Sequence, residues 1–537
     1  MIPRLSEPCR DPRPIPWAHL FAILLFALGL RAVAIARSDA IGTDSYRFLA
    51  AAQCIEEGDW SGAIHDAYHP LTATLIAGVN TVQTWVLGPV DLTDPSNFTA
   101  DQRRRERAGL FISLLSGLAL VWLSIDLARR LFPEVSPAAV GLLTAVQPYF
   151  VRASGDIMSD AIYLTCFAFG LRAAVIALAG AKWSPFIAVG TAAGLAYLTR
   201  PEGLLLIPAV GGMWLLCRPW SWQVLISRSV GSAVAAAFCI LPYVFALGGK
   251  ITDKKDVGTM MGLPGEAAGV SPGGMLAVGD HSLAAASLNE IFKEWFSTAP
   301  ELLGVATIVG AIAIFRGPRR RELGPLLYLG ISLAMGAILL RLLISVGEPG
   351  YVSRRHVFLL VLLSLPFAAK GVALAAAGIA YFLPERGRRW VFPVLGGMVI
   401  AALAPKAIAA HRADQVTQRW AAAYILEHGG PGQRVFSSRE KVGYYAGARL
   451  VPVEAGLTEY RLDQLEKSER AWLVFYRERL AERVPELDRL LGEFGNALEH
   501  HATWAEPRSK RPRHLELYLY TNRSPDPGPR ASAPVGR

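Results

Sequence analysis

The amino-acid sequence predicts a mostly α-helical membrane protein with many transmembrane helices and a small soluble α/β domain near its C-terminal end. The chain has 537 residues, of which 52% are hydrophobic and only 18% are charged, and its mean hydropathy is +0.33. A soluble chain of this length would form roughly three or four domains, but this composition is typical of proteins that cross the bilayer repeatedly.

The net charge of +10 does not indicate nucleic-acid binding. The basic residues lie mostly in short clusters between apolar runs, where the positive-inside rule predicts them. We therefore expect the bilayer as the partner of these clusters and no nucleic acid.

The apolar runs predict the membrane spans. The first run follows basic residues and lacks a small-residue cleavage site after it, so we expect a retained span rather than a signal peptide. A hydrocarbon core of about 30 Å requires about 20 apolar residues. On this measure we predict about eleven spans, at 16–36, 108–128, 136–152, 157–179, 184–199, 202–217, 229–248, 299–316, 324–346, 356–378 and 390–410.

The arginines predict the orientation. Clusters such as Arg129 with Arg130, and the run from Arg316 to Arg321, fall on one side of the bilayer if the N-terminus is cytoplasmic. The run from Arg103 to Arg107 falls on the other side, at the end of a long loop, and long loops follow the charge rule weakly. We therefore expect a bacterial plasma (inner) membrane protein with a cytoplasmic N-terminus and an extracytoplasmic C-terminal domain.

The sequence divides into three parts. Residues 1–410 form the predicted transmembrane domain, with extracytoplasmic loops at 37–107 and 249–297. Residues 411–523 alternate helical periods with short β-type runs, such as "RAWLVFY" and "HLELYLYT", and predict a soluble α/β domain. The tail 524–537 is rich in Pro, Arg and Ser and is expected to be disordered.

Polar residues near span ends are the candidate functional residues, because charges at membrane depth are costly. The first group lies in the first loop, which opens with an amphipathic helical pattern. Its members are Asp44, Tyr46, Arg47, His65, Asp66 and His69. Asp44 follows Thr43, so it could equally serve to cap a helix. The four-residue spacing of His65 and His69 suits a metal on a helix, but Pro70 argues against a helix there.

The second group opens the span at 157–179. Asp156 and Asp160 lie one helical turn apart, with Arg152 just before them. Carboxylates at a helix N-terminus are stabilised by the helix dipole, which is the structural alternative. Two carboxylates on one helix face also suit a cation or a sugar hydroxyl.

The third and fourth groups are basic. Arg200 and Glu202 flank Pro201 in a short turn, and Pro201 excludes Arg200 from a helix. This pair could form a mutual ion pair, or Arg200 could bind a phosphate with its planar fork of donors. The fourth group opens the tenth span and comprises Arg354, Arg355 and His356. Positive charge on the external face suits binding of a lipid phosphate.

These motifs resemble those of GT-C glycosyltransferases, in particular the family 39 protein O-mannosyltransferases and the bacterial aminoarabinose transferases. The similar stretches are "TDSYRFLAAAQCIEEGDW" with "YHPLTATLIAG" in the first loop, "SGDIMSDAIYLTCFAFGL", "GLAYLTRPEGLLLIP" and "SRRHVFLLVLLSLPFAAKGV". The resemblance covers almost the whole chain, including the C-terminal α/β domain.

The resemblance implies transfer of a hexose or pentose from a polyprenyl-phosphate donor to a lipid, glycan or protein acceptor on the extracytoplasmic face. Asp44 would be the general base, and the donor phosphate would be bound by Arg200, Arg354, Arg355 and His356. Further substrate contacts would come from Tyr46, Arg47, His69, Asp156, Asp160 and Glu202. No cofactor is certain: use of a divalent metal such as Mg or Mn stays open, with Asp156 or Asp160 as its ligands.

A multi-span transporter or flippase of a lipid-linked or anionic substrate is the alternative, because charges within membranes also mark substrate paths. The sequence shows no inverted repeat, and its charged groups lie at one membrane face rather than at the midplane. Both features favour the transferase.

Overall fold

The computed structural model describes residues 15–521, with gaps at 39, 65–68, 91–97, 179–181, 218–220, 249–280, 318–322, 347–352, 411, 413–414, 431–432, 438–439, 448, 453–469, 479–488, 490, 493, 495–496 and 507–512. His65, Asp66, most of the predicted loop at 249–297 and the predicted tail at 524–537 therefore lie outside the described residues.

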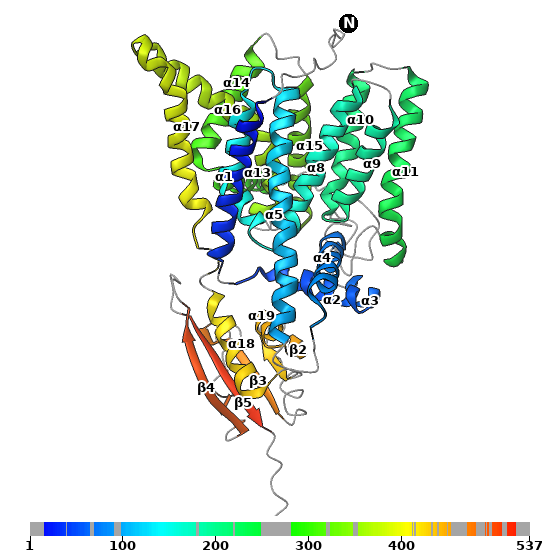
Figure 1. The fold of residues 1–537 in the computed structure, drawn as a ribbon, viewed down its shortest axis with the longest axis vertical. Helices are drawn as coiled ribbons and strands as arrows, with labels where there is room; N and C mark the ends of the chain where they lie inside the picture. The colour runs from blue at the N-terminus through cyan, green and yellow to red at the C-terminus, as the bar shows by residue number, and fades with distance from the viewer. Residues whose placement is uncertain are drawn as a thin grey trace, which may run out of the picture. The chain divides into compact units, whose positions relative to one another are not determined.

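Helices make up almost all of the described chain up to residue 409 (Figure 1). They are α1 (Trp17–Ala36), α2 (Thr43–Glu56), α3 (Trp60–Ile64), α4 (Leu71–Leu87), α5 (Phe98–Leu131), α6 (Pro137–Val146), α7 (Pro148–Ser154), α8 (Ser159–Leu178), α9 (Trp183–Tyr197), η2 (Pro201–Leu205), α10 (Leu206–Cys217), α11 (Trp222–Ala246), α13 (His281–Thr298), α14 (Glu301–Arg316), α15 (Leu323–Val346), η5 (Arg354–Val357), α16 (Phe358–Tyr381) and α17 (Glu385–Ala407).

Seven helices among the described residues are long and apolar enough to cross a membrane, or eight if α13 and α14 form one span bent by 109°. The predicted number of eleven is therefore not confirmed. Three predicted spans correspond to shorter helices: 136–152 is interrupted before Pro148, 184–199 is the 15-residue α9, and 202–217 begins with the 3-10 helix η2. Proline lacks the N–H that continues a helix, so such runs divide where a proline falls.

The chain divides into two compact units. The first comprises Met1–Arg37, Arg47–Val79 and Ala108–Ala409, and the second comprises Ser38–Tyr46, Asn80–Arg107 and Ala410–Arg537. In the first unit, side chains from α5 to α9, α15 and α16 form one large apolar core, in which Phe150, Phe167 and Phe186 are fully buried.

The predicted amphipathic helix at the start of the first loop is confirmed as α2. Phe48, Leu49 and Ala52 are all buried, as the apolar pattern predicts.

The second unit contains a five-stranded sheet in the order β2-β1-β3-β5-β4. Its strands are β1 (Arg434–Ser437), β2 (Arg449–Pro452), β3 (Arg470–Tyr476), β4 (Leu498–Ala505) and β5 (His514–Thr521), accompanied by α18 (Val416–Gly429) and α19 (Glu440–Tyr445). β1 pairs in parallel with β2 and β3, while β5 pairs antiparallel with β3 and β4. The small C-terminal α/β domain of the predicted fold is thus present, and β3 and β5 match the two predicted strands.

Candidate functional site

The turn between α9 and α10 builds the centre of the candidate site. Arg200 has extended backbone angles (φ −154°, ψ 136°), as the following proline dictates. Gly203 then brings η2 back against α9: a Cβ on this residue would lie 2.3 Å from the carbonyl carbon of Ala196. Only glycine fits this close approach, which fixes the position of Arg200.

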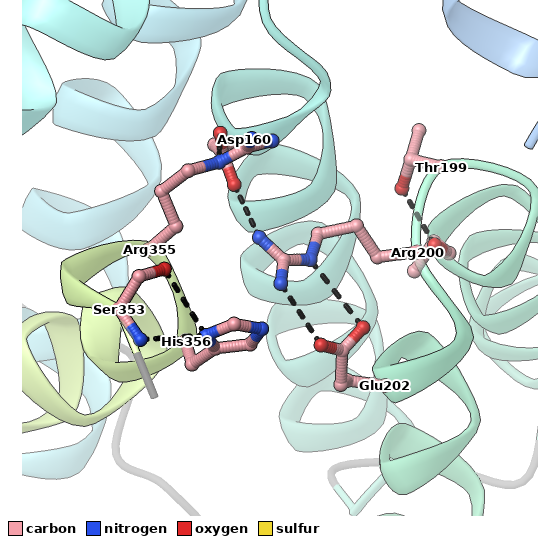
Figure 2. Close-up of polar contacts among 8 residues, drawn as sticks. Asp160, Thr199, Arg200, Glu202, Ser353, Arg355 and His356 are labelled. Atoms are coloured by element: carbon pink, nitrogen blue, oxygen red, sulfur yellow. Dashed lines mark hydrogen bonds and ion pairs between the residues drawn. The ribbon is translucent and has the colours of Figure 1, made fainter. Parts of the chain in front are cut away.

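The carboxylate of Asp160 forms ion pairs with two arginines, Arg200 and Arg355 (Figure 2). It lies in the first turn of α8 and is 1% exposed. Its Oδ1 accepts a hydrogen bond from Nη1 of Arg200, and its Oδ2 accepts one from Nε of Arg355 at 2.9 Å. The structure therefore joins residues from three separate predicted groups around one buried carboxylate.

Arg200 also forms a forked pair with Glu202. Its Nη2 and Nε lie 2.9 and 3.3 Å from the two oxygens of Glu202. Arg200 is thus held by two carboxylates at once, which fixes its guanidinium group more firmly than a single ion pair would. The mutual ion pair that the sequence left as one alternative is present.

Tyr163 is a candidate site residue that no sequence motif predicted. The guanidinium carbon of Arg200 lies 5.7 Å from the centre of its ring. Its hydroxyl is buried and has no hydrogen-bond partner among the described residues. The available signal was its position three residues after Asp160, which places both side chains on one face of α8.

Arg354 points to different partners from Arg355. Its Nη1 donates to the hydroxyl of Tyr149 at 2.6 Å, and its Nε lies 3.7 Å from Oε2 of Glu294. The Tyr149 ring also faces Arg152, whose guanidinium carbon lies 5.5 Å from the ring centre. Tyr149 and Glu294 were not predicted, because their positions at helix ends become informative only once the helices are packed.

His356 lies next to this cluster in η5, whose start it stabilises (Figure 2). The backbone N–H of Ser353 donates to its Nδ1 at 3.1 Å. Nδ1 is therefore the acceptor in this contact, which places the proton of a neutral imidazole on Nε2.

Asp156 does not share the position of Asp160. It is buried, and its Oδ1 accepts a hydrogen bond from the backbone N–H of Ile157 at 2.9 Å. Both oxygens of Asp160 already receive guanidinium groups. No group of three or more His, Cys, Asp or Glu side chains in the described part of the chain could hold a metal. The predicted pair of ligands therefore does not fit a resident metal as arranged, and metal use is not established.

His69 lies in an aromatic environment. It is 3% exposed, with its ring centre 5.1 Å from that of Tyr197 and 5.3 Å from that of Tyr243. Close by, the backbone N–H of Leu71 donates to the carbonyl of Leu198 at 3.0 Å, which joins the start of α4 to the end of α9.

Asp44 lies in the first turn of α2, where the helix dipole stabilises a carboxylate, and its side chain is half-buried. Asp44 and Tyr46 belong to the second unit, whereas Arg47 belongs to the first. Within the second unit, the backbone N–H of Ile41 donates to the hydroxyl of Tyr445 at 3.0 Å.

Arg412 packs against the turn that precedes Asp44. A Cβ on Gly42 would lie 2.8 Å from both terminal nitrogens of Arg412 and 2.6 Å from Oγ of Ser45. Arg412 itself has φ of 61°, a left-handed conformation that is strained for a side-chain-bearing residue. The turn before α2 is therefore fixed tightly by residues of its own unit.

A family model and several solved structures resemble this chain. The model of the dolichyl-phosphate-mannose-protein mannosyltransferase family matches residues 100–246. No curated protein sequence gives a significant match.

Among solved structures, the chain is similar to ArnT from Cupriavidus metallidurans at 15% identity. The TM-score is 0.56 for the apo state, with 94% of this chain and 98% of that chain covered. For ArnT bound to undecaprenyl phosphate the TM-score is 0.55, with 93% and 98% covered. The archaeal oligosaccharyltransferase AglB from Archaeoglobus fulgidus, in complex with an inhibitory peptide and a dolichol-phosphate, gives 14% identity, a TM-score of 0.51, and coverage of 97% and 75%.

At these identities the likeness concerns the fold. The protein has the GT-C fold that its motifs resemble, and its apolar helices make it an integral membrane protein.

Proposed function

We propose that this protein is a glycosyltransferase that moves a sugar from a polyprenyl-phosphate donor to a lipid, glycan or protein acceptor. The match to a mannosyltransferase family model supports this reaction class and favours it over a transporter or flippase. The donor class is supported by the lipids in the similar structures, undecaprenyl phosphate in ArnT and a dolichol-phosphate in AglB.

The gathering of Arg200, Arg354 and Arg355 near the start of α8 carries this proposal. A leaving phosphate needs positive charge that is already in place when the bond breaks. Arg200 is enclosed by two carboxylates, with its side chain 12% exposed, so we assign it the role of positioning the cluster. The side chains of Arg355 and Arg354 are 32% and 52% exposed, so they are the ones that a phosphate can reach.

We further propose that donor binding admits the phosphate to the buried hydroxyl of Tyr163, which would then donate to it. It lies beside Arg200 and lacks a hydrogen-bond partner among the described residues. A buried hydroxyl without a partner is unfavourable unless a ligand satisfies it. In this scheme Asp160 and Glu202 orient the arginines rather than contact the sugar.

The reaction also needs a base for the acceptor. Asp44 would accept the proton of the acceptor hydroxyl while the oxygen of that hydroxyl forms a bond to the anomeric carbon. The bond from that carbon to the phosphate oxygen breaks at the same time, and its electron pair stays on the released polyprenyl phosphate. The anomeric configuration is inverted, and the guanidinium groups balance the negative charge that remains.

The remaining predicted contacts and the orientation complete the proposal. His356 would assist at the phosphate, while Tyr46, Arg47, His69 and Asp156 would contact other parts of the substrates. We place the reaction at the extracytoplasmic face of a bacterial inner membrane, because the charge distribution favours a cytoplasmic N-terminus.

The test uses the purified full-length protein with a panel of polyprenyl-phosphate sugars, and it follows release of polyprenyl phosphate. Asp44→Asn should lower turnover at least about 100-fold, because general base catalysis contributes this much or more. The matched control is Glu57→Gln, which neutralises an exposed carboxylate just after α2 and should retain turnover. Undiminished turnover in Asp44→Asn would remove the base assignment, and inactivity of the wild type on every donor would remove the function.

A further inference from the structure

A second arginine cluster surrounds Asp126, near the C-terminal end of α5. The carboxylate of Asp126 accepts hydrogen bonds from Nη2 of Arg129, from Nε of Arg130 at 2.8 Å and from Nε of Arg172 at 2.7 Å. Arg172 comes from α8, 12 residues after Asp160, which is about 18 Å farther along that helix. The cluster is thus separate from the candidate active site.

The charges of this cluster do not balance. Among the described residues, one carboxylate faces three guanidinium groups, which leaves two positive charges. Asp126 is 5% exposed as a residue, while the side chains of the three arginines are 17–24% exposed. The next acid along the chain is Glu134, in the turn after α5, and counting it still leaves one positive charge in excess within the part of the chain that the structure describes. Partly buried positive charge without a counter-ion is unfavourable.

One donor of the cluster is unused. The Nε atom of Arg129 is buried and has no hydrogen-bond partner among the described residues. An anion at this position would satisfy the donor and the excess charge together, since arginine presents a planar fork that matches phosphate oxygens.

Tryptophans place the cluster at the level of lipid headgroups. The guanidinium carbon of Arg172 lies 5.0 Å from the ring centre of Trp122, which is 37% exposed on α5. At the same end of the bundle, where α8 ends and α9 begins, Trp183 is 46% exposed. The guanidinium carbon of Arg228 lies 3.7 Å from the centre of its ring. Exposed tryptophans that pair with arginines are typical of the boundary between membrane and water.

We propose that Arg129, Arg130 and Arg172 bind the phosphate of an anionic membrane lipid. Each arginine near a membrane surface strengthens binding to anionic lipid by about fivefold. The proposal is independent of the glycosyltransferase activity, because it concerns other residues and another ligand.

Native mass spectrometry of the full-length protein in neutral detergent tests this site. Phosphatidylglycerol should bind in preference to phosphatidylcholine with the same acyl chains, and Arg172→Gln and Arg129→Gln should each weaken that binding about fivefold. Arg316→Gln, which removes an exposed arginine from the last turn of α14, is the matched control and should bind as the wild type does.

Asp126→Asn separates a lipid site from a purely structural ion cluster. Removing the carboxylate leaves three positive charges, so binding of phosphatidylglycerol should tighten by about fivefold. A structural cluster instead predicts a lower unfolding temperature with no gain in binding. Equal binding of the two lipids, or unchanged binding in all three variants, would overturn the proposal.

Inorganic phosphate distinguishes the source of the ligand. If the site takes a membrane lipid, excess inorganic phosphate should leave bound phosphatidylglycerol largely in place. Complete displacement of the lipid by inorganic phosphate would assign the site to a soluble phosphate compound and overturn the assignment to a lipid.

Discussion

The helix α8 carries a cluster of arginines and carboxylates toward each end, and the two clusters differ in how fully their charges are matched. Around Asp160, the carboxylates of Asp160 and Glu202 face Arg200 and Arg355, and the arrangement is largely buried. Around Asp126, one carboxylate faces three arginines. A balanced cluster can be enclosed and fixed in advance while its exposed arginine, Arg355, still contacts a phosphate, whereas the excess charge of the Asp126 cluster itself favours an anion from outside.

The largest expected loss of stability comes from a substitution at the centre of the balanced Asp160 cluster. Arg200→Gln removes the arginine that Glu202 pairs with and leaves the buried Asp160 with Arg355, so we expect the unfolding free energy to fall by about 3–5 kcal/mol. Arg130→Gln, at the other cluster, leaves Asp126 with two arginines and should cost less than about 1 kcal/mol. Thermal unfolding of both variants in the same detergent measures the difference.

A second substitution tests the explanation for that loss. Arg200→Gln combined with Glu202→Gln removes one arginine together with one of its carboxylates, so stability should partly return. Equal stability of Arg200→Gln and Arg130→Gln would show that balance of charge does not govern the Asp160 cluster.

The next effect concerns the backbone beneath Arg200. Gly203→Ala would press a Cβ into the carbonyl carbon of Ala196, so we expect a loss of about 1–3 kcal/mol and lower turnover. Gly211→Ala, in α10, has open space around it and should be neutral or stabilising by up to about 1 kcal/mol. Unfolding curves and turnover of the two variants provide the check, and an unaffected Gly203→Ala would contradict the close packing of η2 on α9.

A smaller change in stability tests the unused hydroxyl of Tyr163. Because this hydroxyl has no protein partner among the described residues, Tyr163→Phe should alter stability by less than about 0.5 kcal/mol while raising the KM for the donor. The control is Tyr476→Phe, where the lost hydroxyl bonds Thr417 and Gln418 and the cost should be about 1–2 kcal/mol. An unchanged donor KM in Tyr163→Phe would remove Tyr163 from the phosphate site.

The smallest expected effect concerns an exposed pair, Glu478 and His514, which serves as a comparison for the buried clusters. Burial favours the neutral form of Glu478, but hydrogen bonds from the backbone N–H and imidazole of His514 outweigh it and lower the pKa of the Glu478 carboxyl. A lowered pKa stabilises the fold above the unfolded-state value of about 4.3, and this stability is lost as the pH falls through the folded-state pKa.

Both side chains of this pair are more than one third exposed, so solvent reduces the gain to a few tenths of a kcal/mol, about 0.2–0.5. The drop in unfolding free energy between pH 7 and pH 4 should therefore be slightly smaller in Glu478→Gln than in the wild type. A larger drop in the variant would contradict the sign of this pKa shift.

The sequence located the Asp160 cluster because charged residues near span ends are rare enough to stand out. Asp160, Arg200, Glu202 and Arg355 were all predicted candidates, and the proline rule gave the extended conformation of Arg200. Which arginine meets which carboxylate depends on the packing of α8, η2 and η5, and no local pattern contains that information.

Other features lay beyond local patterns for different reasons. The number of spans was not confirmed, because apolar runs give no measure of the short buried helices on either side of a proline. The strand β4 was missed because its sequence, LEHHATWA, is polar and largely exposed at the edge of the sheet. The cluster around Asp126 was seen only as part of a basic span end, since its third arginine comes from another helix.

Binding of a radiolabelled polyprenyl phosphate to Arg355→Gln and Arg172→Gln, measured with excess phosphatidylglycerol to occupy the Asp126 cluster, tests the central claim most directly. The donor phosphate should bind at the Asp160 end of α8, so Arg355→Gln should weaken binding about tenfold or more, because a hydrogen bond to a charged group is lost. Arg172→Gln should bind close to the wild-type value. A loss confined to Arg172→Gln, or equal losses in both variants, would contradict the assignment of the two clusters.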